Sequence, residues 1–116
     1  MVSLATFRNL ALSFQESEEL PHFEKLSYRI RNKIFATFDI TTEKAMVKLS
    51  LIDQSVFCSI DSTVIYPVPG GWGKHGATFI ELKFVSVSIL KDAIKHAYNN
   101  VAPASLIKIK TRTGRK

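Results

Sequence analysis

Hydrophobic and polar residues alternate along the chain between residues 26 and 49. The apolar positions of this stretch recur at every second residue: Tyr28, Ile30, Ile34, Ala36, Phe38, Ala45, Val47 and Leu49. This alternation is typical of strands that have one buried and one solvated face. It predicts strands at residues 27–31, 33–39 and 45–49, with a turn at Asn32 and a hairpin tip at residues 41–44.

A helical spacing of apolar residues predicts a first helix over residues 3–14, with Ser3 as its N-cap and one face formed by Leu4, Phe7, Ala11 and Phe14. Pro21 prevents any continuation of that helix, and a short edge strand is expected around residues 22–25.

A second helix is expected to begin after Ser50, with Asp53 completing a weak capping box. Its residues Ile52, Val56 and Ile60 are four apart and are expected to face the core.

The second half of the chain predicts a strand at residues 63–66, a glycine-rich flexible tip around Trp72, and a strand at residues 77–84. Trp72 is expected to fold back onto the sheet, because its large apolar area favours burial. In the last strand, Ile80, Leu82 and Phe84 are expected on one side and Phe79, Glu81 and Lys83 on the other. A long helix follows, capped by Ser86 or Ser88, whose apolar stripe is Leu90, Ala93, Ile94, Ala97, Tyr98 and Val101.

The length of 116 residues favours one domain, which we place at residues 1–110. No apolar run reaches the roughly 20 residues that cross a bilayer, and the first residues do not resemble a signal peptide. A single cysteine, Cys58, fits a reducing compartment, so a cytoplasmic location is expected.

The net charge of +6 is concentrated at the C-terminal end of the chain. Ten basic and ten acidic residues balance one another up to Asp92, and six basic residues follow with no acid among them. Residues 111–116 are short, basic and glycine-containing, and are expected to form a disordered tail. Such an excess raises solubility and nonspecific attraction to anions more than it defines a shaped site.

Few residues of this chain are suited to catalysis or metal binding. The three histidines and Cys58 do not follow a metal-ligand spacing, and Cys58 is expected to be a small core residue. Gly70, Gly71 and Gly73 precede Lys74, but the order and the following strand do not fit a phosphate-binding loop. No enzyme activity, cofactor or metal is therefore expected.

The solvated face of the predicted meander is basic, with Arg29, Arg31 and Lys33 on one side and Lys48 on the returning strand. Strand geometry spaces such side chains by roughly 6–7 Å, which is close to the spacing of phosphates along a nucleic-acid strand. The same charges would also protect an edge strand from aggregation, and both interpretations remain open.

Four stretches of the chain carry a family resemblance, namely Ser27–Ala36, Val47–Leu49, Tyr66–Gly73 and the helix from Leu90 to Tyr98. Through them the chain resembles the MmcQ/YjbR-like family over residues 1–102. The resemblance implies an α+β fold, a two-layer sandwich in which an antiparallel sheet of about five strands carries helices on one face, similar to type III secretion chaperones. Proteins of this family are described as DNA-binding through a double-wing motif of β-hairpins. The chain departs from the family in its C-terminal extension and in Ala97, where a serine is common.

The sequence therefore predicts a noncatalytic module that binds nucleic acid, most simply DNA, as a monomer or weak dimer. The expected contacts are basic strand residues and the two hairpin tips: Arg29, Arg31, Lys33, Lys44, Lys48, Lys74 and His75. The alternative is a protein-interaction adaptor that uses the sheet face or a helix surface. No membrane association is expected.

Overall fold

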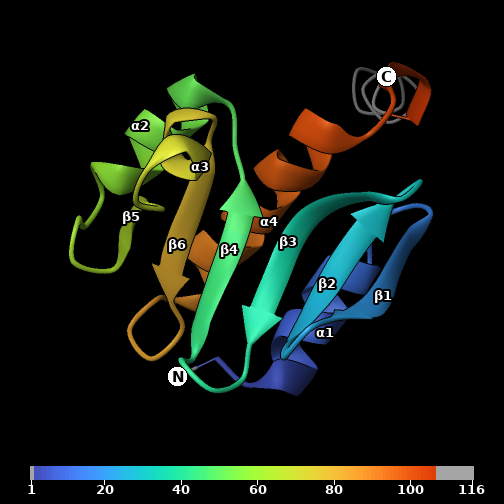
Figure 1. Ribbon diagram of the computed structural model, residues 1–116, viewed down its shortest axis with the longest axis horizontal. Helices are drawn as coiled ribbons and strands as arrows, with labels where there is room; N and C mark the ends of the chain where they lie inside the picture. The colour runs from blue at the N-terminus through green and yellow to red at the C-terminus, as the bar shows by residue number, and fades with distance from the viewer. Residues whose placement is uncertain (1, 107–116) are drawn as a thin grey trace.

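The computed structural model describes residues 2–106. In this part of the chain, six strands form one antiparallel sheet in the order β1-β2-β3-β4-β6-β5 (Figure 1). The strands are β1 Ser17–His22, β2 Lys25–Ile30, β3 Lys33–Asp39, β4 Lys44–Lys48, β5 Ile65–Pro67 and β6 Ala77–Glu81. The expected C-terminal tail and the expected domain boundary at residue 110 lie outside the described residues.

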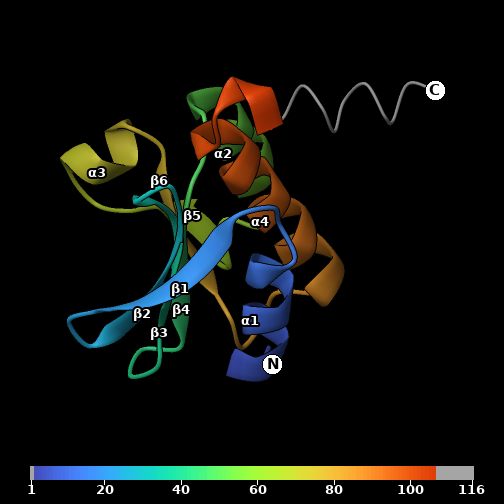
Figure 2. The ribbon, with the colours of Figure 1, turned by 90° about the vertical axis from the view of Figure 1, so that its right-hand side faces the viewer.

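Helices α1 (Leu4–Leu12), α2 (Leu51–Cys58) and α4 (Val87–Val101) cover one side of the sheet, while the short α3 (Gly71–Lys74) projects on the other side (Figure 2). The two-layer α+β architecture expected from the sequence is confirmed. Ser3, Ser50 and Ser86 act as N-caps, each accepting a hydrogen bond from the backbone N–H three residues later. None of the described helices is both long enough and apolar enough to pass through a bilayer.

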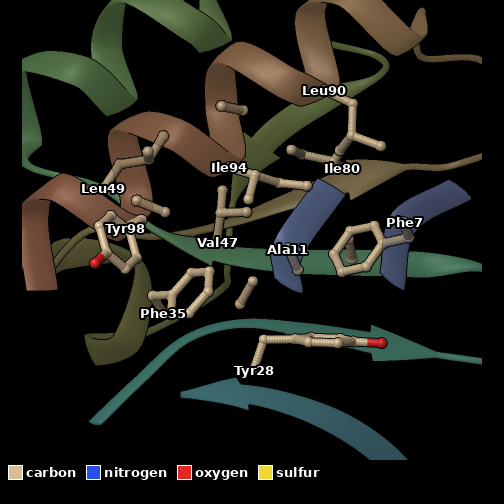
Figure 3. Close-up of a cluster of buried hydrophobic side chains, with 14 of the residues drawn as sticks. Phe7, Ala11, Tyr28, Phe35, Val47, Leu49, Ile80, Leu90, Ile94 and Tyr98 are labelled. Atoms are coloured by element: carbon tan, nitrogen blue, oxygen red, sulfur yellow. The ribbon is translucent and has the colours of Figure 1, made fainter. Parts of the chain in front are cut away.

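The core lies between α1, α4 and the central strands (Figure 3). Phe7 and Ala11 of α1 are fully buried, and the α4 stripe is buried as expected, except that Val101 is only partly covered. From the sheet, Tyr28 packs against the Phe7 ring at 5.4 Å and Phe35 against the Tyr98 ring at 5.5 Å, measured between ring centroids. Aromatic contacts thus join the sheet to both α1 and α4.

The strand at the sheet edge begins earlier than the sequence predicted. β1 covers Ser17–His22 and pairs with β2 through a two-residue turn at Phe23 and Glu24, where an edge strand was expected at residues 22–25. Pro21 is tolerated there because an edge strand leaves one row of backbone groups without a sheet partner. The sheet has six strands, one more than the roughly five that the family resemblance implied.

A β-bulge in β3 changes which side chains reach each face of the sheet. Tyr28 pairs with Ala36, but the next residue, Arg29, pairs with Ile34, so Phe35 is the extra residue. Phe35 is fully buried, whereas Ile34 lies on the opposite, open face. The expectation that Ile34 would point inward with Ala36 was wrong, because the bulge breaks the period of two.

The turn between β2 and β3 contains both Arg31 and Asn32, whose φ angles are 50° and 69°. Asn32 was expected at this turn, but Arg31 was expected in the strand. Two-residue hairpin turns that match the strand twist need positive φ at both positions. Arg31 therefore does not continue the row of strand side chains that begins with Arg29.

The orientation of α2 differs from the prediction. Ile52, Val56 and Ile60 are 78%, 56% and 50% exposed, and the buried residues of this helix are Gln54 and Phe57. The helix lies at the end of the sheet against the short β5, so only a narrow face is covered. An uninterrupted apolar stripe is thus left on the protein surface.

The segment around Trp72 is the helical turn α3 and not a flexible hairpin tip. The Trp72 side chain lines a groove on the open face of the sheet but remains 70% exposed. After this segment, β6 ends at Glu81. The chain then turns, and the backbone N–H of Phe84 donates a hydrogen bond to the Glu81 carbonyl. Phe84 is consequently 71% exposed and does not join Ile80 and Leu82 in the core.

Candidate functional site

The open face of the sheet carries a groove of about 370 Å³. It runs from the β1–β2 hairpin across the central strands to α3, the two features that project on this side in Figure 2. Its lining residues are His22, Lys25, Ile34, Thr37, Met46, Lys48, Val68, Trp72, Ala77 and Phe79. We refer to this feature as the open-face groove. Its volume falls within the range of roughly 300–1,000 Å³ that is usual for ligand sites.

A second cavity, of about 490 Å³, lies where the β2–β3 turn, the end of β4 and the end of α4 meet. We refer to it as the basic cavity, and its lining residues are Arg29, Asn32, Lys33, Ile34, Lys48, Asn100 and Val101. Ile34 and Lys48 line both cavities, so the two are adjacent. Among the residues that the structure describes, no aspartate or glutamate lines either one.

The structure brings three of the seven expected contact residues together, since Arg29, Lys33 and Lys48 line the basic cavity. Arg29 is held by a hydrogen bond of 3.0 Å from its Nε to the Ser27 hydroxyl. The side-chain amide of Asn100 donates to the Lys48 carbonyl at 3.0 Å, which ties the end of α4 to the end of β4. None of the three cations pairs with a carboxylate in the described part of the chain.

Arg31 is occupied by a carboxylate. Its guanidinium makes a two-point ion pair with Glu16, with Nε–Oε1 and Nη2–Oε2 distances of 2.9 and 3.1 Å. The hydrogen bonds from Arg31 lower the pKa of Glu16, so the pair is charged at neutral pH. Arg31 therefore contributes less positive potential to the open face than the other basic residues of the meander.

Lys44 is also engaged by its neighbours. Its Nζ lies 3.8 Å from the Glu81 carboxylate, 5.2 Å from the centroid of the Phe79 ring and 5.7 Å from that of Tyr66. The Tyr66 hydroxyl donates a hydrogen bond to the same carboxylate. Lys44 thus belongs to a polar cluster with Glu81 and Tyr66 at the β5 side of the sheet, and it does not extend from a hairpin tip.

The last two expected contacts, Lys74 and His75, are exposed at the end of α3. Neither is among the residues that line the two cavities. They lie beside Trp72 in the chain, on the segment that projects from the open face (Figure 2). Their place there as contacts remains a prediction.

A buried glutamine fixes the position of α3. Gln54 of α2 donates from its Nε2 to the Gly73 carbonyl at 2.9 Å, and to the Ala77 carbonyl and the Thr78 hydroxyl at 3.2 Å. The Thr78 hydroxyl in turn donates to the Gly76 carbonyl at 2.9 Å. Because buried polar groups need such partners, this network holds the segment that carries Trp72 against the end of the sheet.

Two glycines permit the close packing of this segment. A Cβ at Gly73 would lie 1.9 Å from the Val68 carbonyl oxygen, and one at Gly76 would lie 1.9 Å from that of Leu49. Gly76 also has a φ of 104°, which side-chain-bearing residues rarely adopt. The backbone of α3 is therefore packed directly on neighbouring backbone, and Trp72 is presented from a fixed support.

Sequence reasoning missed several groove residues. His22 and Lys25 lie on either side of the β1–β2 turn, which the sequence pattern placed differently, and Ile34 reaches the groove through the bulge. Phe79 gave a usable signal, because an aromatic residue alternated with Glu81 and Lys83 on the expected solvated side of its strand. The exposed Phe23 at the hairpin turn gave none.

An activated thiol and a metal-ligand cluster are both missing from residues 2–106. Cys58 is a half-buried free thiol, and burial raises its pKa, which disfavours the reactive thiolate. Within residues 2–106, no three histidine, cysteine or acidic side chains gather as metal ligands would. What the two cavities provide is unpaired positive charge next to an apolar and aromatic surface, which suits the binding of an anion with a planar apolar part.

Comparison with known proteins identifies one solved structure of the same shape. Neither a family model nor a curated protein matches the sequence. The chain is similar to the crystal structure of Deinococcus radiodurans protein DR2400, with a TM-score of 0.74 and 19% identity, over 84% of this chain and 77% of that one. The two chains share a fold. The neighbour contains the domain DUF419, which is placed in the MmcQ/YjbR-like superfamily.

Proposed function

We propose that this protein is a noncatalytic nucleic-acid-binding module of the MmcQ/YjbR-like family, with DNA as its simplest ligand. Its contact surface is the open face of the sheet together with the basic cavity. The family assignment is supported by the motifs of the sequence and by the fold shared with the DUF419 structure. The function is supported by the chemistry of the surface itself.

One observation supports this function above the others: Arg29, Lys33 and Lys48 line one cavity with no acidic side chain from residues 2–106 among them. A phosphate backbone supplies the regularly spaced anions that such a cluster would neutralise. Arginine can hold a phosphate with two hydrogen bonds, and lysine contributes a point charge. Contacts of this kind position the ligand and do not read bases, so binding is expected to be weak and to depend strongly on salt.

The test is a fluorescence-anisotropy titration of a labelled oligonucleotide at several salt concentrations. The double variant Arg29→Gln/Lys33→Gln should bind more weakly and reduce the slope of log affinity against log salt by about 1.4 for single strands or 1.8 for duplex. The matched control is Lys91→Gln/Lys95→Gln, which removes the same charge from α4, on the other side of the sheet. The absence of wild-type binding at about 50 mM salt, or equal slopes for the two variants, would refute the proposal.

The second candidate is a protein-interaction adaptor, and the exposed stripe of α2 favours it. Leu51, Ile52 and Val56 of α2, and Ile60 just beyond its end, are each at least half exposed. Contiguous apolar surface of this kind marks many protein interfaces. Sedimentation of the wild-type protein and of Ile52→Ser/Val56→Ser tests self-association through this stripe: a wild-type dimer that the variant loses would support a second copy of the chain as partner, and a monomer at all concentrations would exclude that partner.

A further inference from the structure

We infer that the open-face groove binds an unpaired nucleobase, so that the module selects single-stranded over duplex nucleic acid. This inference rests on the proposed function and adds to it the class of ligand. The phosphates adjoining that base would lie against Arg29, Lys33 and Lys48 in the adjacent basic cavity. The shared chemistry is an unpaired nucleotide, in DNA or RNA.

The first observation is the state of Trp72. Its side chain is 70% exposed, and its indole stacks on no other ring in the part of the chain that the structure describes. The segment beneath it is nevertheless rigidly held by Gln54 and by the close packing at Gly73. Proteins that bind single strands usually stack bases on exposed aromatic side chains. Trp72 has these properties, and its backbone is held in place by the neighbouring segments.

The second observation is Phe23, which neighbours the groove residue His22. It occupies the β1–β2 turn with a φ of 59° and is 94% exposed. A bulky residue in the left-handed region is strained, and full exposure gives it no packing to offset that cost. Its only ring contact among the described residues is with the neighbouring His22, itself a lining residue of the groove. Local stability would favour asparagine or glycine here, so the aromatic ring suggests a binding role.

The third observation is the composition of the groove between these two residues. Ile34, Met46 and Phe79 give it an apolar surface, while Lys25 and Lys48 supply positive charge. A base has an apolar face and is attached to a phosphate, so it complements both parts. An apolar peptide would fill the groove without using the charge of the basic cavity, which adjoins it at Lys48.

Single strands are favoured because the groove accepts the face of a base. In a duplex that face is stacked on its neighbours, and exposing it requires the base to be unstacked and unpaired. Stacking on aromatic side chains depends little on base identity, since every base presents a π-face. The groove would therefore discriminate strandedness while remaining nearly indifferent to sequence.

The experiment compares a labelled single-stranded thymidine 12-mer, a uridine 12-mer and a 12-base-pair duplex by anisotropy. Trp72 is the only tryptophan, so its intrinsic fluorescence is followed in the same titration. The wild-type protein should bind the single strands more tightly and show quenching of Trp72 as a base stacks on it. Trp72→Leu and Phe23→Asn should each lose roughly 5- to 150-fold in single-strand affinity, with duplex affinity changed by less than about twofold.

Phe84→Asn is the matched control, because it removes a similarly exposed aromatic side chain that lines neither cavity. Thermal melts identify loss of folding, and Phe23→Asn should melt no lower than wild type because asparagine tolerates positive φ. Equal affinity for single strands and duplex, with both variants like wild type, would overturn the inference and leave phosphate binding intact. Binding of no nucleic acid at about 50 mM salt, or quenching of Trp72 only by an acidic apolar peptide, would overturn the proposed function together with the inference.

Discussion

Replacement of the buried glutamine beneath α3 provides a sensitive test of how the groove is supported. Gln54→Glu exchanges the amide donor for an oxygen that faces the Gly73 and Ala77 carbonyls and the Thr78 hydroxyl. The two carbonyls keep their backbone donors, the N–H groups of Gly76 and Val68. The cost therefore comes mainly from a buried carboxylate that lacks enough hydrogen-bond donors.

Such a group is expected to lower the free energy of unfolding by about 2–4 kcal/mol. For a domain of this size, that corresponds to a melting temperature lower by roughly 8–16 °C. Gln54→Met has a similar length and no charge, and it should cost only about 1 kcal/mol because it leaves the carbonyls with their backbone partners. A greater loss of unfolding free energy in Gln54→Glu than in Gln54→Met would identify the buried charge as the cause.

The assay is thermal unfolding followed by circular dichroism, with Trp72 fluorescence as a local probe. Gln15→Glu is the control, since Gln15 is the other glutamine of the chain and its side chain is exposed. It should melt within about 2 °C of the wild-type protein. A Gln54→Glu variant that melts as high as Gln15→Glu, with unchanged Trp72 emission, would refute the conclusion that this network supports α3.

Two further predictions concern the core and the dependence on pH. Ile94→Ala should lower the free energy of unfolding by about 2–5 kcal/mol in denaturant titrations, because Ile94 is fully buried between α4 and the sheet; a loss below about 0.5 kcal/mol would contradict that placement. The hydrogen bonds from Arg8 and then Tyr28 lower the pKa of Glu19 below its usual 4.5. The resulting stability is present above pH 4.5 and is lost as the pH falls through the lowered pKa, so Glu19→Gln should melt lower than wild type at pH 6 and approach it near pH 3. Parallel melting curves across this range would rule out that role.

The core and the order of its elements could be read from the sequence, because burial imposes regular spacing. The stripe from Leu90 to Tyr98 repeats with the helical period and is buried as predicted. Serine caps also follow local rules, and Ser3, Ser50 and Ser86 cap their helices. These features depend on neighbours in the chain, which a sequence displays directly.

The groove could be predicted only in part, because its residues meet through long-range structure. Lys48 of the groove and Arg29 of the adjacent basic cavity were found by alternation, but Lys25 and Ile34 depend on where a turn and a bulge fall. Lys33 lines the basic cavity although the bulge pairs it with the buried Ile30, so the alternation that placed it on the same face as Arg29 was wrong. The apolar stripe of α2 was misjudged because helical spacing shows amphipathicity and does not show whether a partner exists. Arg31 and Lys44 were placed in the site without knowledge of Glu16 and Glu81, which approach them only in the folded chain.

The bulge at Phe35 divides β3 into two segments that follow opposite phases of the same alternation. The segment after it supplies Ala36 and Phe38 to the core, whereas the one before it supplies Ile34 to the groove. Deleting Phe35 would restore an uninterrupted β2–β3 ladder with Ile34 opposite Arg29, so Ile34 would stay in the groove and the core would lose one aromatic side chain. A single inserted residue therefore acts as a reading-frame shift in three dimensions, because the alternation read from Ala36 and Phe38 assigns Ile34 to the wrong face of the sheet.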